Sequence, residues 1–278
     1  MNGSASRTIR SFLYVPATAP KRFDKAVDSG AHAVIVDLED AVAAQDKPAA
    51  REILAATCKH LRDACDHRGT ELLVRINAHG SHWHADDAQA CESLPIDGVV
   101  VPKPADPRAI SQLANRLPGR RMYLLVESLA GFENIAAIAR VPQVTRLMFG
   151  AADLMLEFGT RQDGAPLHHF RSLLTMHSRL AGLPSPVDGV CTALDHTDLL
   201  SSEIDRAKDF GFGGKLCVHP SQIEAVNRQF APSAAQRAWA LRVCEVADTA
   251  NGAAVRVDGA LVDAPILEQA KRILAEAT

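Results

Sequence analysis

Acidic side chains follow several short apolar runs along this chain of 278 residues, at the points where those runs end. They are Asp37, Glu39, Asp40, Glu127, Asp153 and Asp195. The six cysteines are scattered, without the paired spacing of a zinc site. Carboxylates that converge without thiolates form a hard, oxygen-rich site, which suits Mg²⁺ better than zinc or copper. We therefore predict a magnesium site held by Glu127 and Asp153, which end neighbouring runs.

A protein-bound Mg²⁺ usually has only one or two carboxylate ligands and completes its octahedral shell with water and substrate oxygens. Such an ion can chelate a 2-oxo or 2-hydroxy acid and act on it as template and Lewis acid. Arg75 and Lys103 end two further runs and are candidates for contacts with that acid. A planar guanidinium can hold a carboxylate or a developing enolate oxygen, but Arg75 could also be an ion-pair partner of a neighbouring carboxylate. Lys103 stands between two prolines and could instead be solvated.

The acidic residues near the predicted ligand pair have structural explanations as well. Asp37 and Asp40 could cap the turn that follows them, and Asp153 could be a helix N-cap or the partner of an arginine. Their placement together at the ends of apolar runs favours a functional site. We expect Asp37, Glu39 and Asp40 to surround the metal ligands without binding the ion.

The apolar runs alternate with stretches of helical periodicity, which is the pattern of a β/α protein. The predicted strands are residues 11–16, 33–37, 71–77, 98–103, 122–128, 146–151, 188–193 and 215–220. The predicted helices between and after them are residues 21–29, 46–66, 83–94, 107–117, 132–139, 168–181, 197–210 and 221–230. Runs that are apolar throughout, such as residues 33–36 and 99–101, should be covered on both faces. They therefore indicate a parallel sheet.

Eight strand–helix units close a (β/α)8 barrel, so we predict a TIM barrel over residues 8–231, with an open doubly wound sheet as the alternative. In a barrel the carboxyl ends of all strands meet at one face, where active sites lie. A barrel would therefore gather the polar run ends there. Residues 232–278 exceed the barrel and contain two more predicted helices, 233–249 and 264–277. This helical extension could be a lid, an oligomer contact or a cover for the barrel wall, and its periodicity does not choose among them.

The composition excludes several classes of protein. The formal net charge is only -3 and aromatic residues make up 5% of the chain, which argues against a nucleic-acid partner. No apolar run approaches the roughly 18 residues of a membrane span, and the polar N-terminus is not followed by a signal-peptide segment. We expect a cytoplasmic protein with reduced cysteines and no membrane partner.

Recognisable motifs are spread over most of the chain. They lie at residues 10–16, 37–42, 75–77, 101–103, 126–128, 149–154, 211–215, 218–223 and 262–265. In type and order they resemble the HpcH/HpaI aldolase and citrate lyase β-subunit family, most closely its citrate lyase β-like branch of acyl-thioester lyases. The resemblance implies a (β/α)8 barrel with Mg²⁺ on the residues that match Glu127 and Asp153. It also implies that Arg75 contacts the oxygen atoms of the substrate.

The same resemblance assigns a role to the C-terminal extension. It implies that Asp263 is the acid/base residue and acts in the active site of an adjacent subunit of a trimer or hexamer. Asp263 could also be a helix N-cap ahead of Pro265, and the two roles are compatible.

The reaction that the resemblance implies is reversible cleavage of a 3-hydroxy-acid thioester, such as malyl-, citramalyl- or citryl-CoA, into an acetyl thioester and a 2-oxo acid. The partners would be that 2-oxo acid and a thioester of CoA or of an acyl carrier protein, bound by a homotrimer or other homo-oligomer. Residues 155–159 and 188–195 depart from the family's pattern, which leaves the acyl carrier open. Two other functions stay open: a metal-dependent aldolase of free hydroxy-oxo acids, and an obligate β subunit of a citrate lyase complex.

Overall fold

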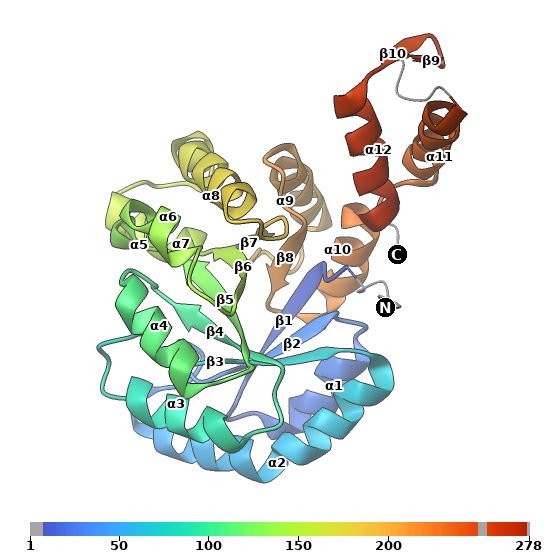
Figure 1. Ribbon diagram of the computed structural model, residues 1–278. Helices are drawn as coiled ribbons and strands as arrows, with labels where there is room; N and C mark the ends of the chain where they lie inside the picture. The colour runs from blue at the N-terminus through green and yellow to red at the C-terminus, as the bar shows by residue number, and fades with distance from the viewer. Residues whose placement is uncertain (1–7, 250–254, 277–278) are drawn as a thin grey trace. The chain divides into compact units, whose positions relative to one another are not determined.

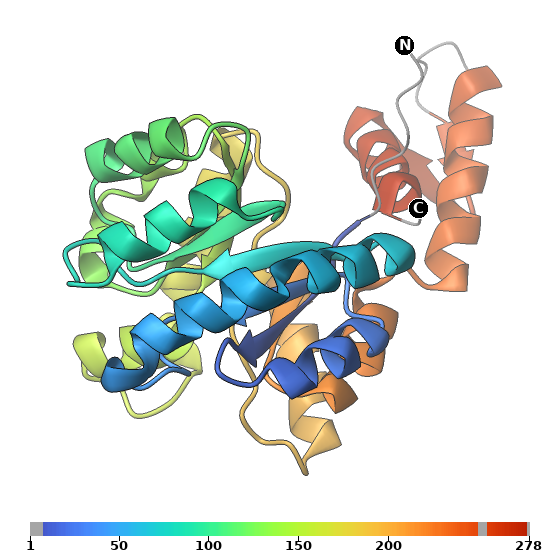
Figure 2. The same ribbon diagram turned by 90° about the horizontal axis from the view of Figure 1, so that it is seen from below.

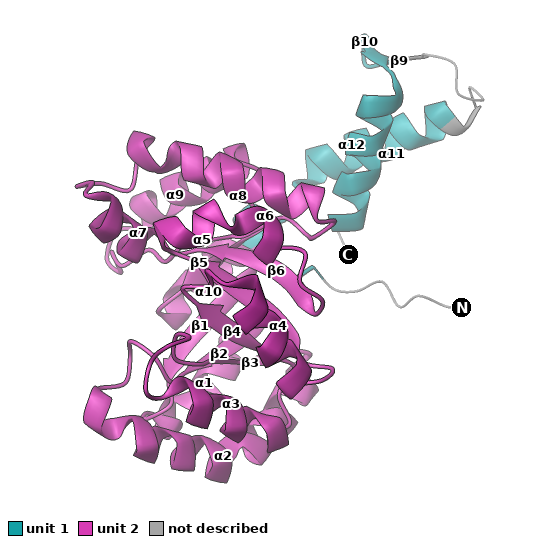
Figure 3. Ribbon diagram, turned by 60° about the vertical axis from the view of Figure 1, so that its left-hand side comes forward, with its two compact units in different colours: residues 1–8, 228–278 teal, residues 9–227 magenta. Residues whose placement is uncertain are grey.

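The computed structural model of the chain describes residues 8–249 and 255–276. Its contacts divide it into two compact units (Figure 3). The barrel unit is Ile9–Asn227, and the C-terminal unit is built around Arg228–Thr278. Each unit has its own hydrophobic core and is described by itself.

The barrel unit contains eight parallel strands that close on themselves in the order β1 to β8 (Figure 1), which confirms the predicted (β/α)8 barrel. Pairing of β1 with β8, in which Phe12 stands opposite Leu216, excludes the open sheet. The strands are β1 Ser11–Pro16, β2 Ala33–Asp37, β3 Glu71–Arg75, β4 Gly98–Pro102, β5 Arg121–Val126, β6 Val144–Phe149, β7 Val187–Asp188 and β8 Gly214–Cys217.

Helices follow the strands and cover the outside of the barrel, as α1 and α2 do side by side in Figure 2. The long helix α2 ends at Gly69, whose φ of 62° is the left-handed conformation that glycine adopts readily. The helical elements are η1 Pro20–Arg22, α1 Phe23–Asp28, η2 Ala44–Asp46, α2 Lys47–Arg68, α3 His84–Ser93, α4 Pro107–Arg116, α5 Leu129–Glu133, α6 Ile135–Ile138, α7 Ala151–Phe158, η3 Ala165–Leu167, α8 His168–Leu180, α9 Thr197–Asp209, η4 Pro220–Gln222 and α10 Ile223–Phe230.

Six predicted strands, β3 to β8, end earlier than expected, and the ends of β6 and β7 matter most for the site. β6 stops at Phe149, and the chain turns at Gly150 into helix α7, which the sequence patterns did not predict. Asp153 therefore lies in the first turn of a helix, where a negative charge is favourable, and not at a strand end. β7 has only two residues, because the apolar residues beyond Gly189 leave the sheet and line a cavity.

The barrel interior changes character at one level along the strands. Its lower layers are apolar and contain Phe12, Ala33, Ile35, Leu73, Val100, Tyr123, Leu125, Met148, Val187 and Leu216. Side chains alternate along a strand, so the residue two places after an inward-pointing residue also points inward. These next residues are Asp37 after Ile35, Arg75 after Leu73, and Glu127 after Leu125. The apolar layers thus form a floor beneath a charged layer at the carboxyl ends of the strands.

The C-terminal unit consists of two helices and a small hairpin. The elements are α11 Ala234–Thr249, β9 Val255–Val257, β10 Ala260–Val262 and α12 Ala264–Glu276. Asp258 and Gly259 connect the antiparallel strands with positive φ angles of 51° and 82°, the conformation of a two-residue hairpin turn. We did not predict this hairpin. In the described parts of both units, no helix is long and apolar enough to cross a membrane.

Candidate active site at the carboxyl ends of the barrel strands

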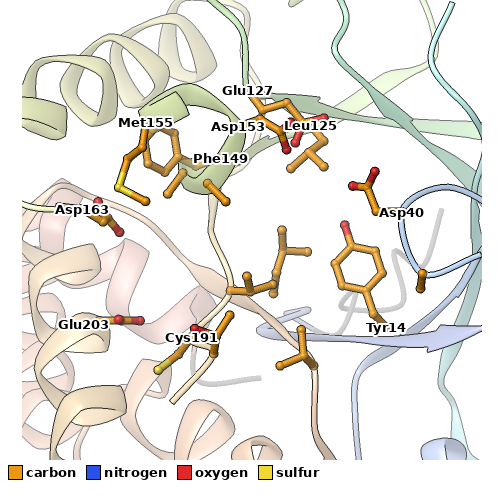
Figure 4. Close-up of a pocket in the computed structure, with 18 of the residues that line it drawn as sticks. Tyr14, Asp40, Leu125, Glu127, Phe149, Asp153, Met155, Asp163, Cys191 and Glu203 are labelled. Carbon is orange, nitrogen blue, oxygen red and sulfur yellow. The ribbon is translucent and has the colours of Figure 1, made fainter. Parts of the chain in front are cut away.

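A cavity of about 520 Å³ lies at the carboxyl ends of the strands (Figure 4). This size is ordinary for a small-molecule site, for which cavities of roughly 300 to 1,000 Å³ are typical. Its charged lining residues include Asp37, Asp40, Arg75, Glu127 and Asp153, and its apolar ones include Leu125, Phe149, Val190 and Leu216. The structure therefore brings together most of the polar residues that the sequence singled out.

Glu127 and Asp153 lie next to each other on one side of this cavity (Figure 4). Glu127 is buried, whereas the side chain of Asp153 is 37% exposed. A Cβ atom at Gly150 would overlap the Cβ of Glu127 and lie 2.5 Å from its Oε2. Glycine at this position is therefore what allows the Glu127 carboxylate to stand beside the start of α7.

The Lys103 ammonium stands where three carboxylates converge. Its Nζ atom is 3.4 Å from Glu39 Oε1, 3.4 Å from Asp153 Oδ1 and 3.8 Å from Glu127 Oε1. Lys103 has a φ of 48°, a left-handed conformation that costs free energy in any residue except glycine, and its backbone amide donates to Glu127 Oε1. Glu127 and Asp153 thus already share one cation in this structure.

The two buried carboxylates of this cluster, Glu127 and Glu39, have raised pKa values. Burial, with a smaller contribution from Glu39, raises the pKa of Glu127 to about 8. Burial also raises the pKa of Glu39 to about 7, although Arg75 opposes this shift. For Lys103, burial lowers the pKa, but Glu127, Glu39 and Asp153 reverse this effect, so its pKa lies above the ordinary value. A divalent cation at this place would offset the excess negative charge.

The donor set fits magnesium. Within residues 8–249 and 255–276, no three His, Cys, Asp or Glu side chains are arranged to hold a metal ion. Glu127 and Asp153 would therefore supply two carboxylate ligands and leave the other positions to water and substrate. Mg²⁺ accepts this arrangement, whereas structural zinc sites use four protein ligands.

Arg75 forms ion pairs with neighbouring carboxylates and also lines the cavity. It binds Asp37 through two parallel hydrogen bonds, Nε to Oδ1 at 2.7 Å and Nη2 to Oδ2 at 2.6 Å. Its Nη1 atom lies 2.9 Å from Glu39 Oε2 and 3.2 Å from Asp40 Oδ2. Asp37 also accepts hydrogen bonds from the backbone amides of Glu39 and Ala41, so it caps the following turn as well. These contacts fix the guanidinium rigidly at the cavity.

Sequence reasoning missed the residue that anchors the Glu39 loop. The buried Lys47 Nζ donates to the carbonyl oxygens of Leu38 and Glu39, both at 2.9 Å, and to Asn77 Oδ1 at 2.7 Å. Lys47 opens helix α2, where a lysine is usually solvated, so the local sequence carries no signal of this role.

The far end of the cavity carries a second ionic network that the sequence did not reveal. Asp163 and Glu203 line it. Arg171 and Arg206 pair with Asp163 at 2.7 and 2.9 Å, and Lys215 pairs with Glu203 at 3.0 Å. Both carboxylates at this end are therefore already neutralised by protein cations.

Two predicted residues lie elsewhere. Asp195 is exposed and lines a separate small pocket formed by residues 195–199. Asp263 belongs to the C-terminal unit, where its Oδ1 accepts a hydrogen bond from the Ile266 amide at the start of α12. Its N-cap role is thus observed, and its role in proton transfer remains a prediction.

Comparison with known proteins assigns the chain to a family. The family model for HpcH/HpaI aldolase/citrate lyase matches residues 10–220. A (3S)-malyl-CoA thioesterase of Cereibacter sphaeroides is 33% identical over 274 residues, which cover 96% of this chain and 94% of the relative. A citrate lyase subunit beta-like protein of Mycobacterium tuberculosis is 34% identical over 273 residues, with 96% and 94% coverage.

Solved structures agree with this assignment. CitE from Mycobacterium tuberculosis in complex with magnesium, acetoacetate and coenzyme A superimposes with a TM-score of 0.81 at 33% identity. The match covers 98% of this chain and 99% of CitE. The chain therefore belongs to the HpcH/HpaI aldolase/citrate lyase family.

Proposed function

We propose that the chain is a Mg²⁺-dependent carbon–carbon lyase that cleaves a 3-hydroxy-acid thioester of CoA into an acetyl thioester and a 2-oxo acid. The observation that carries the proposal is the pair of carboxylates Glu127 and Asp153, which share one cation beside Arg75 at the cavity. The magnesium, acetoacetate and coenzyme A bound by the related CitE support the choice of ion and of acyl carrier.

Glu127 and Asp153 would hold the ion. When bound, Mg²⁺ supplies a chelating template for the carboxylate and the adjoining oxygen of the acid, together with Lewis-acid activation of that oxygen. The apolar floor of the barrel beneath the site excludes water from below and strengthens the electrostatic interactions above it.

The other charged residues would stabilise the charge that develops in the reaction. In cleavage the 3-hydroxyl gives up its proton to solvent and carbon 3 becomes the keto carbon of the 2-oxo acid. The bond between carbons 2 and 3 breaks, its electron pair leaves the acetyl half as an enolate, and the methyl carbon of that half then takes up a proton. Arg75, held in place by Asp37, would offset the charge of the enolate oxygen. Asp263 would deliver and remove the methyl proton, from its own subunit or from a neighbouring one. Lys103 would pair with the carboxylate of the acid.

Hydrolysis of the thioester is a second candidate, favoured by the relative named as a malyl-CoA thioesterase. The two reactions differ in their products. A lyase yields acetyl-CoA and a 2-oxo acid in equal amounts, whereas a thioesterase yields free CoA and the free hydroxy acid.

One experiment distinguishes these functions. The purified chain is incubated with Mg²⁺ and, in turn, with malyl-, citramalyl- and citryl-CoA, and the release of glyoxylate, pyruvate or oxaloacetate is measured beside that of free CoA. We expect an oxo acid with equimolar acetyl-CoA. Free CoA alone would indicate the thioesterase, and turnover of free hydroxy-oxo acids without CoA would indicate an aldolase. Activity only after addition of partner subunits would indicate an obligate β subunit.

We further propose a cytoplasmic homo-oligomer, a trimer or hexamer, in which Asp263 completes a neighbouring site. The six cysteines are unpaired in the structure, as expected in a reducing compartment. Sedimentation analysis of the purified protein tests the oligomeric state.

A further inference from the structure

Tyr14 lies where the apolar floor of the barrel meets the charged layer: it pairs with Ile35 of the floor, and its ring contacts Arg75 of the charged layer. Along β1, Phe12 belongs to the apolar floor, and Tyr14 packs above it as the next inward-pointing residue. Figure 4 shows its hydroxyl directed into the cavity, toward the side that carries Glu127 and Asp153. The Arg75 guanidinium lies over its ring, 4.7 Å from the centroid.

The Tyr14 hydroxyl is buried and has no hydrogen-bond partner among the residues that the structure describes. An unsatisfied buried hydroxyl is destabilising, so such a group at the wall of a cavity is a candidate donor to a ligand or an ordered water. Arg75 does not satisfy it, because its guanidinium donates to Asp37 and Asp40 and contacts Tyr14 only through the ring.

Burial keeps the phenol of Tyr14 protonated. Burial raises the pKa of Tyr14 well above its ordinary value, Arg75 opposes this shift, and Asp37 and Glu127 add to it. The group is therefore a neutral hydrogen-bond donor at any physiological pH, and it can satisfy an anionic oxygen without giving up its proton.

The barrel topology places Tyr14 opposite the ligand pair. In a closed ring of eight strands, β1 and β5 stand on opposite sides, and Glu127 directly follows β5. An acid held at Glu127 and Asp153 would have Tyr14 on the facing side of the same cavity. If the ion were chelated by one carboxylate oxygen and the adjoining oxygen of the acid, the second carboxylate oxygen would be left for a protein donor.

We propose that the Tyr14 hydroxyl donates a hydrogen bond to this second carboxylate oxygen of the acid bound at Glu127 and Asp153. Tyr14 is thus a substrate-binding residue, in addition to supporting Arg75 through its ring. This assignment rests on the proposed function for the identity of the acid. The donated proton stays on the phenol oxygen throughout the reaction.

The chain offers a matched control, because it contains only two tyrosines. Tyr123 donates from its hydroxyl to Glu71 Oε2 at 2.6 Å, and neither residue lines the cavity. Tyr14→Phe removes the unpartnered hydroxyl but keeps the ring against Arg75. Tyr123→Phe removes a hydroxyl outside the cavity.

Kinetics provide the first test. A hydrogen bond to a charged group corresponds to a factor of roughly 10 to 100, so kcat/KM of Tyr14→Phe for the preferred thioester should fall by about that factor. Tyr123→Phe should stay within about twofold of the wild type, as expected for a change outside the site. A Tyr14→Phe variant with wild-type kcat/KM would overturn the assignment.

Ligand binding provides a second test that does not depend on turnover. Tyr123→Phe protein carrying tyrosine labelled with ¹³C at Cζ has one signal, that of Tyr14. We expect this signal to shift when pyruvate is added in the presence of Mg²⁺, but not with Mg²⁺ alone. We also expect Tyr14→Phe to bind Mg²⁺ normally and pyruvate about 10-fold more weakly.

The two tests separate failure of this inference from failure of the proposed function. If wild-type protein cleaves no thioester but the Tyr14 signal responds to pyruvate and Mg²⁺, the proposed reaction is wrong and the Tyr14 contact stands. If the protein is an active lyase but the signal does not move and Tyr14→Phe binds pyruvate normally, the Tyr14 contact is wrong.

Discussion

Replacing Lys103 with methionine should strengthen Mg²⁺ binding and weaken binding of the acid. The Lys103 ammonium lies 3.4 Å from Asp153 Oδ1 and 3.8 Å from Glu127 Oε1, so in the metal-free protein it neutralises the carboxylates that would bind the ion. A divalent cation must compete with this ammonium or tolerate it nearby. Methionine keeps the length of the side chain and removes the competing charge.

The distances set the size of the effect. Two unit charges 3.4 Å apart interact with about 1 kcal/mol in bulk water and about 5 kcal/mol at an effective dielectric constant of 20. The Lys103 side chain is 37% exposed, so solvent screening places its effect in the lower part of this range, at about 1–2 kcal/mol. Mg²⁺ should therefore bind Lys103→Met about 5 to 30 times more tightly than wild type.

Isothermal titration with Mg²⁺ measures this affinity directly. Lys59→Met is the matched control, because Lys59 is an exposed residue of α2 outside the cavity lining, and its Mg²⁺ affinity should equal that of wild type. Titration with pyruvate at saturating Mg²⁺ should show weaker binding to Lys103→Met, since the acid loses a nearby cation. Unchanged or weaker Mg²⁺ binding by Lys103→Met would refute the reasoning that lysine and metal share these carboxylates.

Three further predictions concern neighbouring features. Gly150→Ala should lower the free energy of unfolding by about 1–3 kcal/mol and weaken Mg²⁺ binding, since its Cβ would collide with Glu127. Wild-type stability in urea denaturation together with normal Mg²⁺ affinity would contradict this. Burial raises the pKa of Glu127 to about 8 and of Glu39 to about 7, so the stabilisation from their protonated forms is complete below about pH 4.5 and lost as the pH rises through 7 and 8. In urea denaturation of the metal-free protein, the free energy of unfolding should fall as the pH rises through this range. Glu127→Gln should make that fall smaller. Asp263→Asn should keep the α12 cap and Mg²⁺ binding but lower kcat about 100-fold to 10,000-fold, and a near-normal kcat would remove Asp263 from the mechanism.

The barrel was predictable because its signals are local. The strands Ser11–Pro16 and Ala33–Asp37 were predicted to the residue, since runs buried on both faces are apolar and the residues that end them are not. The largest error in the barrel, at β7, has a physical cause. Apolar residues after Gly189 resemble a strand, yet they are apolar because they line the cavity. An apolar composition indicates that residues are shielded from water. It does not distinguish a strand of the sheet from a loop that lines the cavity.

The charged rim was predictable for the same reason, but its internal contacts were not. Arg75 and Asp37 could be placed on one rim from their positions at strand ends, whereas the bidentate pair between them depends on register across β2 and β3. Lys47 acts through a hydrogen bond to Asn77, which is far away in sequence. Tyr14 is notable because its hydroxyl has no hydrogen-bond partner among the described residues. No pattern around either residue distinguishes a solvated lysine from a buried anchor, or a core tyrosine from a ligand contact.

The central claim is that Glu127 and Asp153 hold one divalent cation, and Mg²⁺ titration of Asp153→Ala tests it most directly. The control is Asp195→Ala, which removes an exposed carboxylate outside the cavity lining. We predict that wild type and Asp195→Ala bind one Mg²⁺ per chain, and that Asp153→Ala remains folded by circular dichroism but loses both Mg²⁺ binding and metal-dependent turnover. A folded Asp153→Ala variant with wild-type Mg²⁺ affinity would contradict the claim.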